Sequence, residues 1–180
     1  CPADASVAPY LCYAVEDGPV RLVMLDTMQP GSHSGHCPEA VAGWLERTLA
    51  ARPGVPTLLF MHHPPFVTGM GAMDEPFENV GRLADILSRS PWVRLCCGHM
   101  HRPIVPQGAG CIALPPPAVS MQIDLDLSPE GGDTFRMETP GYLLHHWDGS
   151  VLNSHICQIP CSPTFSGPHP FVGSVNPVEG

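Results

Sequence analysis

Two stretches of the chain, LLFMHHPP at residues 58–65 and VRLCCGHMHRP at residues 93–103, decide its fold and its candidate site. Each is a short apolar run that ends in histidines and is then stopped by proline. Runs of this length between turn residues are typical of buried strands. Ligands of open α/β sheets bind beyond the carboxyl ends of the strands, so we expect both histidine groups at one edge of a sheet.

Strands and helices alternate around these two stretches. Strands are predicted at 20–26, 57–61 and 92–97, and helices from Pro38 to about Ala51 and over 79–89, with Asn79 as N-cap. This alternation predicts parallel strand pairing. After Ile104, short β-like segments follow at 119–127, 133–138, 142–147 and 150–159, with Asp148-Gly149 as a hairpin turn. We expect one domain over 1–160, β-rich from about residue 104, and a Pro- and Gly-rich surface segment at 161–180.

Composition excludes several classes of protein. The 180 residues are 43% hydrophobic and 14% charged, which argues against a disordered chain. The formal net charge of −9 disfavours a nucleic-acid partner or a membrane surface bound through basic residues. No apolar run of about 18 residues is present, so we expect no bilayer span. The eight cysteines show no CxxC spacing, and we expect mostly reduced thiols in a cytoplasmic protein, with Cys157 and Cys161 as the pair that would bridge if any does.

The histidines suggest a metal site. Neutral imidazoles are good ligands for zinc, iron and manganese, and Gly98 lets the backbone approach a ligand closely. A single histidine at a strand end is usually a hydrogen-bonded structural residue, and each motif alone is a weak signal. Two such groups with a helix between them, His62-His63 and His99-Met100-His101, favour a metal site.

These residues also carry a resemblance to a known family. FMHHPP followed by CCGHMHRP resembles the last two metal-binding motifs of the calcineurin-like metallophosphoesterases, in the branch of bacterial class III cyclic nucleotide phosphodiesterases and glycerophosphodiesterases. The segments VRLVMLDT, PPFVTGMGAMD and SGPHPF are similar to that branch as well. The resemblance implies an α/β fold in which two β-sheets form a sandwich flanked by helices. It also implies a hydrolase in which two Fe, Mn or Zn ions, about 3.5–4 Å apart, clamp a phosphate and activate water.

Matching the motifs residue by residue assigns His62 and His99 to one ion and His101 to the other. His63 matches no ligand and is expected to orient its neighbours or the substrate. The family's earlier motifs, Asp-x-His, Gly-Asp-x-x-Asp and Gly-Asn-His-Asp/Glu, do not occur in the sequence. We therefore expect that the chain lacks the N-terminal βαβ part of the fold, that the catalytic histidine lies upstream, and that at most one ion binds without the bridging carboxylate.

Two hypotheses of function follow from the resemblance. The first is a metal-dependent phosphodiesterase that hydrolyses a small cyclic nucleotide or glycerophosphodiester at a dinuclear site, of which this chain carries the C-terminal half. The second is an inactive fragment or degenerate relative that acts as a metal-binding or association domain, and a homodimer is possible under either. If strands are missing, an apolar surface should be exposed beside residues 20–26 or 57–61.

Other polar or apolar groups near the motifs have two interpretations each. Cys96 and Cys97 could supply a nucleophile beside His99, or could be buried thiols of a strand. The loop after HHPP could form an apolar lip over the site or could only pack against itself. Its Asp74 could face the substrate or could be a solvated acid. The apolar residues of this loop are Phe66, Met70, Met73 and Phe77. We expect His33 and His36 at the surface, and His145 and His146 at the edge of a hairpin.

Overall fold

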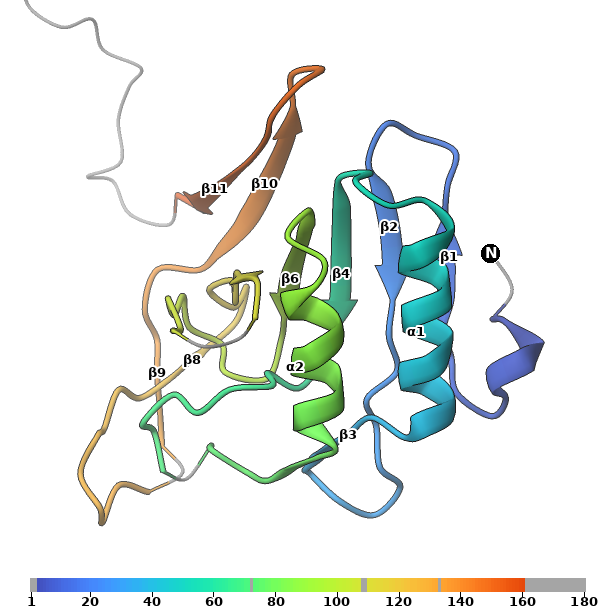
Figure 1. The fold of residues 1–180 in the computed structure, drawn as a ribbon. Helices are drawn as coiled ribbons and strands as arrows, with labels where there is room; N and C mark the ends of the chain where they lie inside the picture. The colour runs from blue at the N-terminus through green and yellow to red at the C-terminus, as the bar shows by residue number, and fades with distance from the viewer. Residues whose placement is uncertain (1–2, 72, 108–109, 133, 161–180) are drawn as a thin grey trace, which may run out of the picture.

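The computed structural model describes residues 3–71, 73–107, 110–132 and 134–160, so the segment 161–180 lies outside the described residues. Strands and helices alternate along the first half of the chain, as the sequence predicts (Figure 1). The elements are η1 (Ala5–Val7), β1 (Tyr13–Val15), β2 (Arg21–Met24), β3 (Gly35–His36), α1 (Glu39–Ala51), β4 (Thr57–Met61), β5 (Phe77–Glu78), α2 (Val80–Ser88), β6 (Val93–Cys97), β7 (Ile112–Ala113), β8 (Gln122–Ile123), β9 (Phe135–Arg136), β10 (Gly141–Trp147) and β11 (Leu152–Gln158).

A five-stranded sheet in the order β1-β2-β4-β6-β7 forms the centre of the fold. Strands β2, β4, β6 and β7 run parallel, which confirms the predicted pairing, and β1 is antiparallel to β2. Met61 of β4 lies opposite Cys97 of β6. The two histidine motifs therefore leave the sheet at the same level and on the same edge.

Helices α1 and α2 cover one face of this sheet (Figure 1). Val41, Leu45 and Leu49 of α1 pack with Leu83 and Leu87 of α2 in the main core, as the sequence predicts. Asn79 is the N-cap of α2, but it adopts a left-handed conformation (φ 61°) and its side chain makes no capping hydrogen bond. The sequence therefore predicts the start of α2 correctly and the capping interaction wrongly.

Strands β10 and β11 form a separate two-stranded antiparallel sheet on the other side of the central sheet (Figure 1). The predicted hairpin turn is present: Oδ1 of Asp148 accepts the N–H groups of Ser150 and Val151, and Gly149 has a φ of 101°. Parallel and antiparallel sheets with two principal helices make the chain a mixed α/β structure, compatible with the metallophosphoesterase-type fold.

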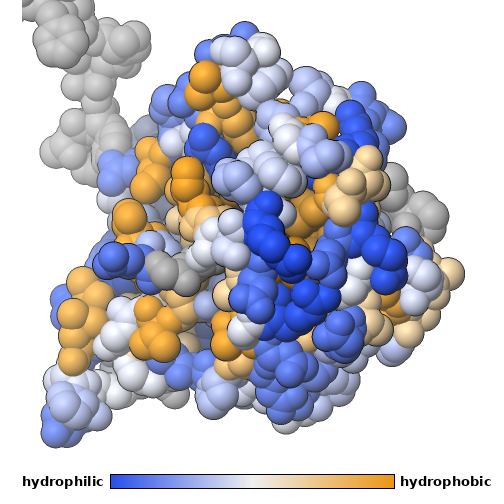
Figure 2. Space-filling model, in the orientation of Figure 1, coloured by the Kyte–Doolittle hydropathy of each residue, from blue (hydrophilic) through white to orange (hydrophobic). Residues whose placement is uncertain are grey.

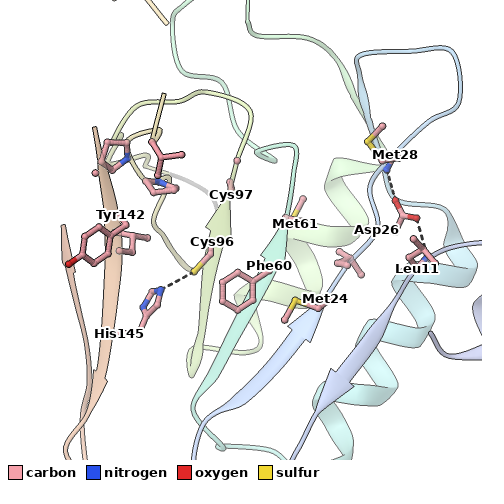
Figure 3. Close-up of a pocket in the computed structure, with 17 residues that line it drawn as sticks. Leu11, Met24, Asp26, Met28, Phe60, Met61, Cys96, Cys97, Tyr142 and His145 are labelled. Carbon is pink, nitrogen blue, oxygen red and sulfur yellow. Dashed lines mark hydrogen bonds between the residues drawn. The ribbon is translucent and has the colours of Figure 1, made fainter. Parts of the chain in front are cut away.

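An apolar hollow of about 680 Å³ lies between this hairpin and the central sheet (Figure 3). Met24, Phe60 and Met61 line it from the sheet, and Tyr142 and His145 line it from β10. Exposed apolar side chains at its rim include Leu11 (67% exposed) and Val119 (72% exposed). Apolar side chains are therefore exposed around this hollow beside β2 and β4, and the extent of the exposed apolar surface that the sequence predicts there stays a prediction.

The outer surface is divided by polarity. Hydrophilic side chains gather over the two helices, whereas apolar side chains are exposed on the side that carries β8 to β11 (Figure 2). Arg82 and Arg89 of the α2 region pair with Glu46 of α1 on the hydrophilic side. No helix among the described residues is long and apolar enough to cross a membrane.

Candidate metal centre

The two histidine motifs meet just beyond the ends of β4 and β6. The N–H of Gly98 donates to the carbonyl oxygen of His62 at 2.9 Å, which joins the two loops directly. A Cβ atom placed on Gly98 would lie 3.0 Å from Nδ1 of His62. The glycine is therefore needed for the close approach of the two loops, as the sequence suggests.

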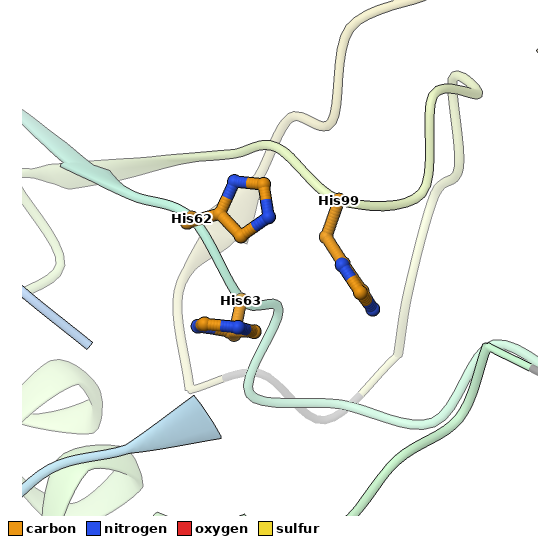
Figure 4. A group of neighbouring side chains, drawn as sticks. All are labelled: His62, His63 and His99. Carbon is orange, nitrogen blue, oxygen red and sulfur yellow. The ribbon is translucent and has the colours of Figure 1, made fainter. Parts of the chain in front are cut away.

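His62, His63 and His99 form one cluster (Figure 4). One ligand atom from each ring lies within 4.8 Å of the other two. The ring centroids of His62 and His63 are 4.8 Å apart, and those of His62 and His99 are 5.3 Å apart. Imidazole nitrogens at this spacing are able to surround one transition-metal ion after small side-chain adjustments, since Zn–N bonds are about 2.0–2.1 Å.

The backbone at His99 and His101 is strained. Their φ angles are 66° and 51°, in the left-handed region that side chains other than glycine rarely adopt. Strain of this kind costs about 1–3 kcal/mol per residue and gathers at functional sites. The surrounding loops hold both imidazoles in place against this cost.

Thr27 fixes the ring of His63. Its hydroxyl oxygen lies 2.9 Å from Nδ1 of His63 and accepts the backbone N–H of the same residue at 3.4 Å. Both side chains are buried, and sequence reasoning missed Thr27, which comes from the loop after β2. Because its Nδ1 contacts a hydroxyl, His63 is suited to orient the other histidines of the cluster. Its ring is also close enough to them to be a metal ligand itself.

The imidazoles of the cluster favour the neutral form that binds metals. Burial lowers the pKa of His62 and of His99, and burial with the neighbouring histidines lowers the pKa of His63 to about 4. A charge on His101 would lower the pKa of both His62 and His99, so His101 lies within electrostatic reach of the two. In the neutral form, each ring has one nitrogen with a free lone pair that can bind a metal ion.

His101 supplies a direct test of whether the site suits a metal ion. Its Nδ1 is buried and has no hydrogen-bond partner among the described residues. A buried polar atom without a partner is costly, and a ligand is one common reason for it. The cluster of His62, His63 and His99 fits a transition-metal ion, and the unpartnered nitrogen of His101 is a further candidate ligand. The three-residue cluster includes His63 and not His101, so the assignment of the individual ligands remains a prediction.

Two other candidates have structural roles. Cys96 is 7% exposed, and burial raises the pKa of its thiol to about 12, so it is protonated and unsuited to act as a nucleophile. Oδ1 of Asp74 accepts the N–H and the hydroxyl of Thr68, and its Oδ2 accepts the N–H of Gly69. Asp74 therefore closes its own loop and is not a freely solvated acid, and it also lines the hollow beside Phe66 and Phe77.

Two smaller hollows open beside the cluster. One of about 250 Å³ is lined by Phe66 and Phe77, and another of about 340 Å³ by Ile123 and Phe135. They share His33, Met73, Glu75 and His99. The apolar lip predicted for the loop after HHPP is present, apart from Met70, which is buried. His33 is exposed, as predicted, but also borders the cluster, whereas His36 pairs with Glu78.

A methyl group at position 98 should disturb the cluster. We expect Gly98→Ala to lower the affinity for Zn²⁺ about 10-fold or more, because the new Cβ displaces the ring of His62. Isothermal titration with Zn²⁺ measures this change. Gly81→Ala in α2 is the matched control, because nothing lies within 4 Å of its Cβ position. Equal Zn²⁺ affinity of the two variants would contradict the expectation.

The lowered pKa of His63 makes stability depend on pH. In the metal-free protein, the ring titrates near pH 4 when folded and near 6.5 when unfolded, so the unfolded chain binds more protons between these values. We expect the unfolding free energy to fall as the pH drops from 6.5 to 4, with His63 contributing up to about 1.4 kcal/mol per pH unit.

Urea denaturation at several pH values tests the contribution of His63. His63→Gln should flatten the slope of unfolding free energy against pH, whereas His146→Gln on the exposed side of β10 should leave it unchanged. A slope that is the same in wild type and His63→Gln would show that His63 titrates normally.

Known proteins similar to this chain are bacterial phosphodiesterases. The chain is 36% identical over 166 residues to a probable glycerophosphodiester phosphodiesterase of Arcobacter nitrofigilis, which covers 90% of the chain and 60% of the relative. It is 32% identical to a glycerophosphodiester phosphodiesterase of Enterobacter lignolyticus over 86% of the chain and 56% of the relative. It is 33% identical to the 3',5'-cyclic adenosine monophosphate phosphodiesterase of Escherichia coli K12 over 73% of the chain and 48% of the relative.

No protein-family model matches the chain. The mixed α/β fold is nevertheless compatible with these relatives, which belong to the metallophosphoesterase superfamily. Its matched region spans about half to 60% of the length of these relatives. The resemblance found in the two histidine motifs is thereby confirmed.

Proposed function

We propose that this chain supplies the histidine side of a dinuclear metal centre in a phosphodiesterase that hydrolyses a small phosphodiester. The observation that carries the proposal is the cluster of His62, His63 and His99 at the edge of the sheet. The buried and unpartnered Nδ1 of His101 supports it. The names of its relatives as glycerophosphodiester and cyclic nucleotide phosphodiesterases support this reaction class.

In this proposal His62 and His99 hold one ion and His101 holds the other, while His63 is held by Thr27 and orients the cluster. Divalent ions of the Fe, Mn or Zn type, held by these residues, would supply positive charge for binding the phosphate and for activating water. Burial lowers the pKa of His62 and of His99 and so favours their neutral form, and the loops hold His99 and His101 in the left-handed backbone conformation.

The two hollows beside His99 suit the groups on either side of a phosphodiester. Phe66 and Phe77 line the first hollow, and Ile123 and Phe135 line the second, so each offers apolar contact to part of a substrate. The shared residues His33, Met73, Glu75 and His99 lie where the two meet. Small phosphodiesters fit hollows of this size, and the assay described below identifies the one that is hydrolysed.

One observation favours the second hypothesis, a metal-binding or association domain. The cluster of close ligand atoms consists of histidines, and no carboxylate among the described residues belongs to it. Two dications without an anion between them repel one another, so these residues alone suit a single ion. We therefore propose that hydrolysis needs carboxylates from outside this cluster. A small phosphodiester partner, a homodimer and a cytoplasmic location remain predictions.

Hydrolysis by a longer form tests the proposal. We would join the chain to the part of the Arcobacter relative that lies outside the matched region and assay glycerophosphocholine, cyclic AMP and a phosphomonoester with added Mn²⁺ or Zn²⁺. Turnover of at least one diester that stops with a chelator is the expected result. A folded, metal-loaded protein that hydrolyses no diester would overturn the proposal and favour the association domain.

A further inference from the structure

The hollow of about 250 Å³ beside the histidine cluster combines aromatic rings with negative charge, and we call it the aromatic hollow. Phe66 and Phe77 line it, and Asp74 and Glu75 are the carboxylates of its lining. In the described part of the chain no arginine lines this hollow or the adjoining one of about 340 Å³, and the sequence contains no lysine. The two hollows therefore have a negative local charge when their histidines are neutral.

The rings of the aromatic hollow are held in place by the fold. Phe77 of β5 is paired with Gly35 of β3. A Cβ atom on Gly35 would lie 2.6 Å from Cε2 of Phe77 and 2.7 Å from Cβ of His63, so the glycine allows the ring and the cluster to come close together. Phe66 and Phe77 also pack against the main core. A ligand of this hollow would find both rings already ordered, which lowers the entropic cost of binding.

Glu75 is the acid of the lining that is available to a ligand. The oxygens of Asp74 accept hydrogen bonds from Thr68 and Gly69, whereas the carboxylate of Glu75 makes no hydrogen bond or ion pair among the described residues. Glu75 is exposed and lines both hollows. Burial lowers the pKa of His99 and the charge of Glu75 opposes this lowering, so Glu75 lies within electrostatic reach of the cluster.

Aromatic rings beside a free carboxylate suit a positively charged group. The faces of aromatic rings attract cations, and proteins bind quaternary ammonium ligands with such rings. A carboxylate nearby adds a direct attraction between opposite charges. A neutral group would gain only apolar contact with Phe66 and Phe77, and an anionic group would be repelled by Asp74 and Glu75. The lining therefore favours a cation over a neutral or anionic group of the same size.

We propose that Phe66, Phe77 and Glu75 form a cation-binding subsite, and that Glu75 makes the site select phosphodiesters in which one ester group ends in a substituted ammonium. The proposal rests on the proposed function, because the metal centre would hold the phosphate beside His99, which lines the same hollow. A nucleobase is the alternative occupant. It could stack on the rings, but it would leave the charge of Glu75 unused.

Binding of the ester group alone tests the subsite apart from hydrolysis. We would titrate the metal-free 180-residue chain with choline and with 3,3-dimethylbutan-1-ol, a neutral molecule of the same shape, and follow both by NMR. Choline should bind at least ~3-fold more tightly and shift the ring signals of Phe66 and Phe77. Equal affinity for the two compounds would overturn the proposal. Adenosine binding more tightly than choline would identify a nucleobase as the occupant and overturn it as well.

A matched pair of variants tests the role of Glu75. Glu75→Gln keeps the size of the side chain and removes its charge, so it should abolish most of the preference for choline over the neutral compound. Glu130→Gln is the control, because Glu130 is also exposed but lines neither hollow. It should leave the preference within about 2-fold of the parent. A preference that survives in Glu75→Gln would show that Glu75 does not select the cation.

Kinetics of the joined protein separate the subsite from the reaction. Glu75→Gln should raise the KM for glycerophosphocholine at least ~3-fold and leave the KM for its 3,3-dimethylbutyl analogue within about 2-fold. Choline binding by the chain without hydrolysis of any diester by the joined protein would keep the cation subsite and overturn the proposed function. Hydrolysis with no preference for the ammonium ester would keep the proposed function and overturn the subsite.

Discussion

Replacing His99 with alanine in the joined, carboxylate-containing protein is expected to lower diester hydrolysis by a factor of about 10²–10³ or more. His99 is the residue that the cluster and both neighbouring hollows share. Its loss removes the ligand that we propose and also a side chain that lines both hollows. The same order of loss is expected for His62→Ala and His101→Ala.

Steady-state kinetics and metal content together measure this effect. His36→Ala is the control, because this histidine pairs with Glu78 and lies outside the cluster. A His99→Ala protein that keeps full metal content and more than about a tenth of the activity would show that the ring is structural. Comparing the metal content of His62→Ala with that of His101→Ala also reveals whether the two histidines bind different ions.

The position of the site could be predicted from the sequence because it depends on the regular part of the fold. Apolar runs of five residues ending at His62 and at Gly98 predict two parallel strands, and their register follows from the fixed geometry of a sheet. The helices could be predicted for a similar reason, since the apolar positions Val41, Leu45 and Leu49 repeat at helical spacing.

The second half of the chain is less regular and was predicted less well. Strands β8 and β9 have two residues each, where the sequence suggested segments of nine and six. Whether such short strands form depends on packing against neighbouring strands more than on the local sequence pattern. Only β10 and β11, whose turn at Asp148-Gly149 is encoded locally, match their predicted ranges closely.

Long-range polar contacts could not be predicted at all. Arg21 is fully buried, and donates to Thr57 and to the carbonyl oxygen of Thr48, although a charged residue at the start of a strand usually lies at the surface. The contact between Thr27 and His63 joins loops that are 36 residues apart in sequence. Such pairs come from tertiary packing, and a single sequence has no periodicity that reveals them.

The 180-residue chain by itself is expected to bind at most one Zn²⁺ or Mn²⁺ ion and to hydrolyse bis(p-nitrophenyl) phosphate at a rate near background. The physical reason is charge. The described cluster offers neutral imidazoles without a carboxylate, and two dications about 4 Å apart repel each other strongly unless an anion lies between them. One ion can polarise a phosphate, but it leaves the diester without the paired clamp that the family uses.

Metal content by mass spectrometry, measured with hydrolysis before and after addition of a chelator, checks this expectation. The joined protein serves as the positive comparison, and its rate should exceed that of the 180-residue chain by at least about 10³-fold. His62→Ala should also reduce the single ion's occupancy in the short chain, because His62 belongs to the described cluster. Two ions per short chain with chelator-sensitive turnover would mean that groups beyond the histidine cluster already complete the centre.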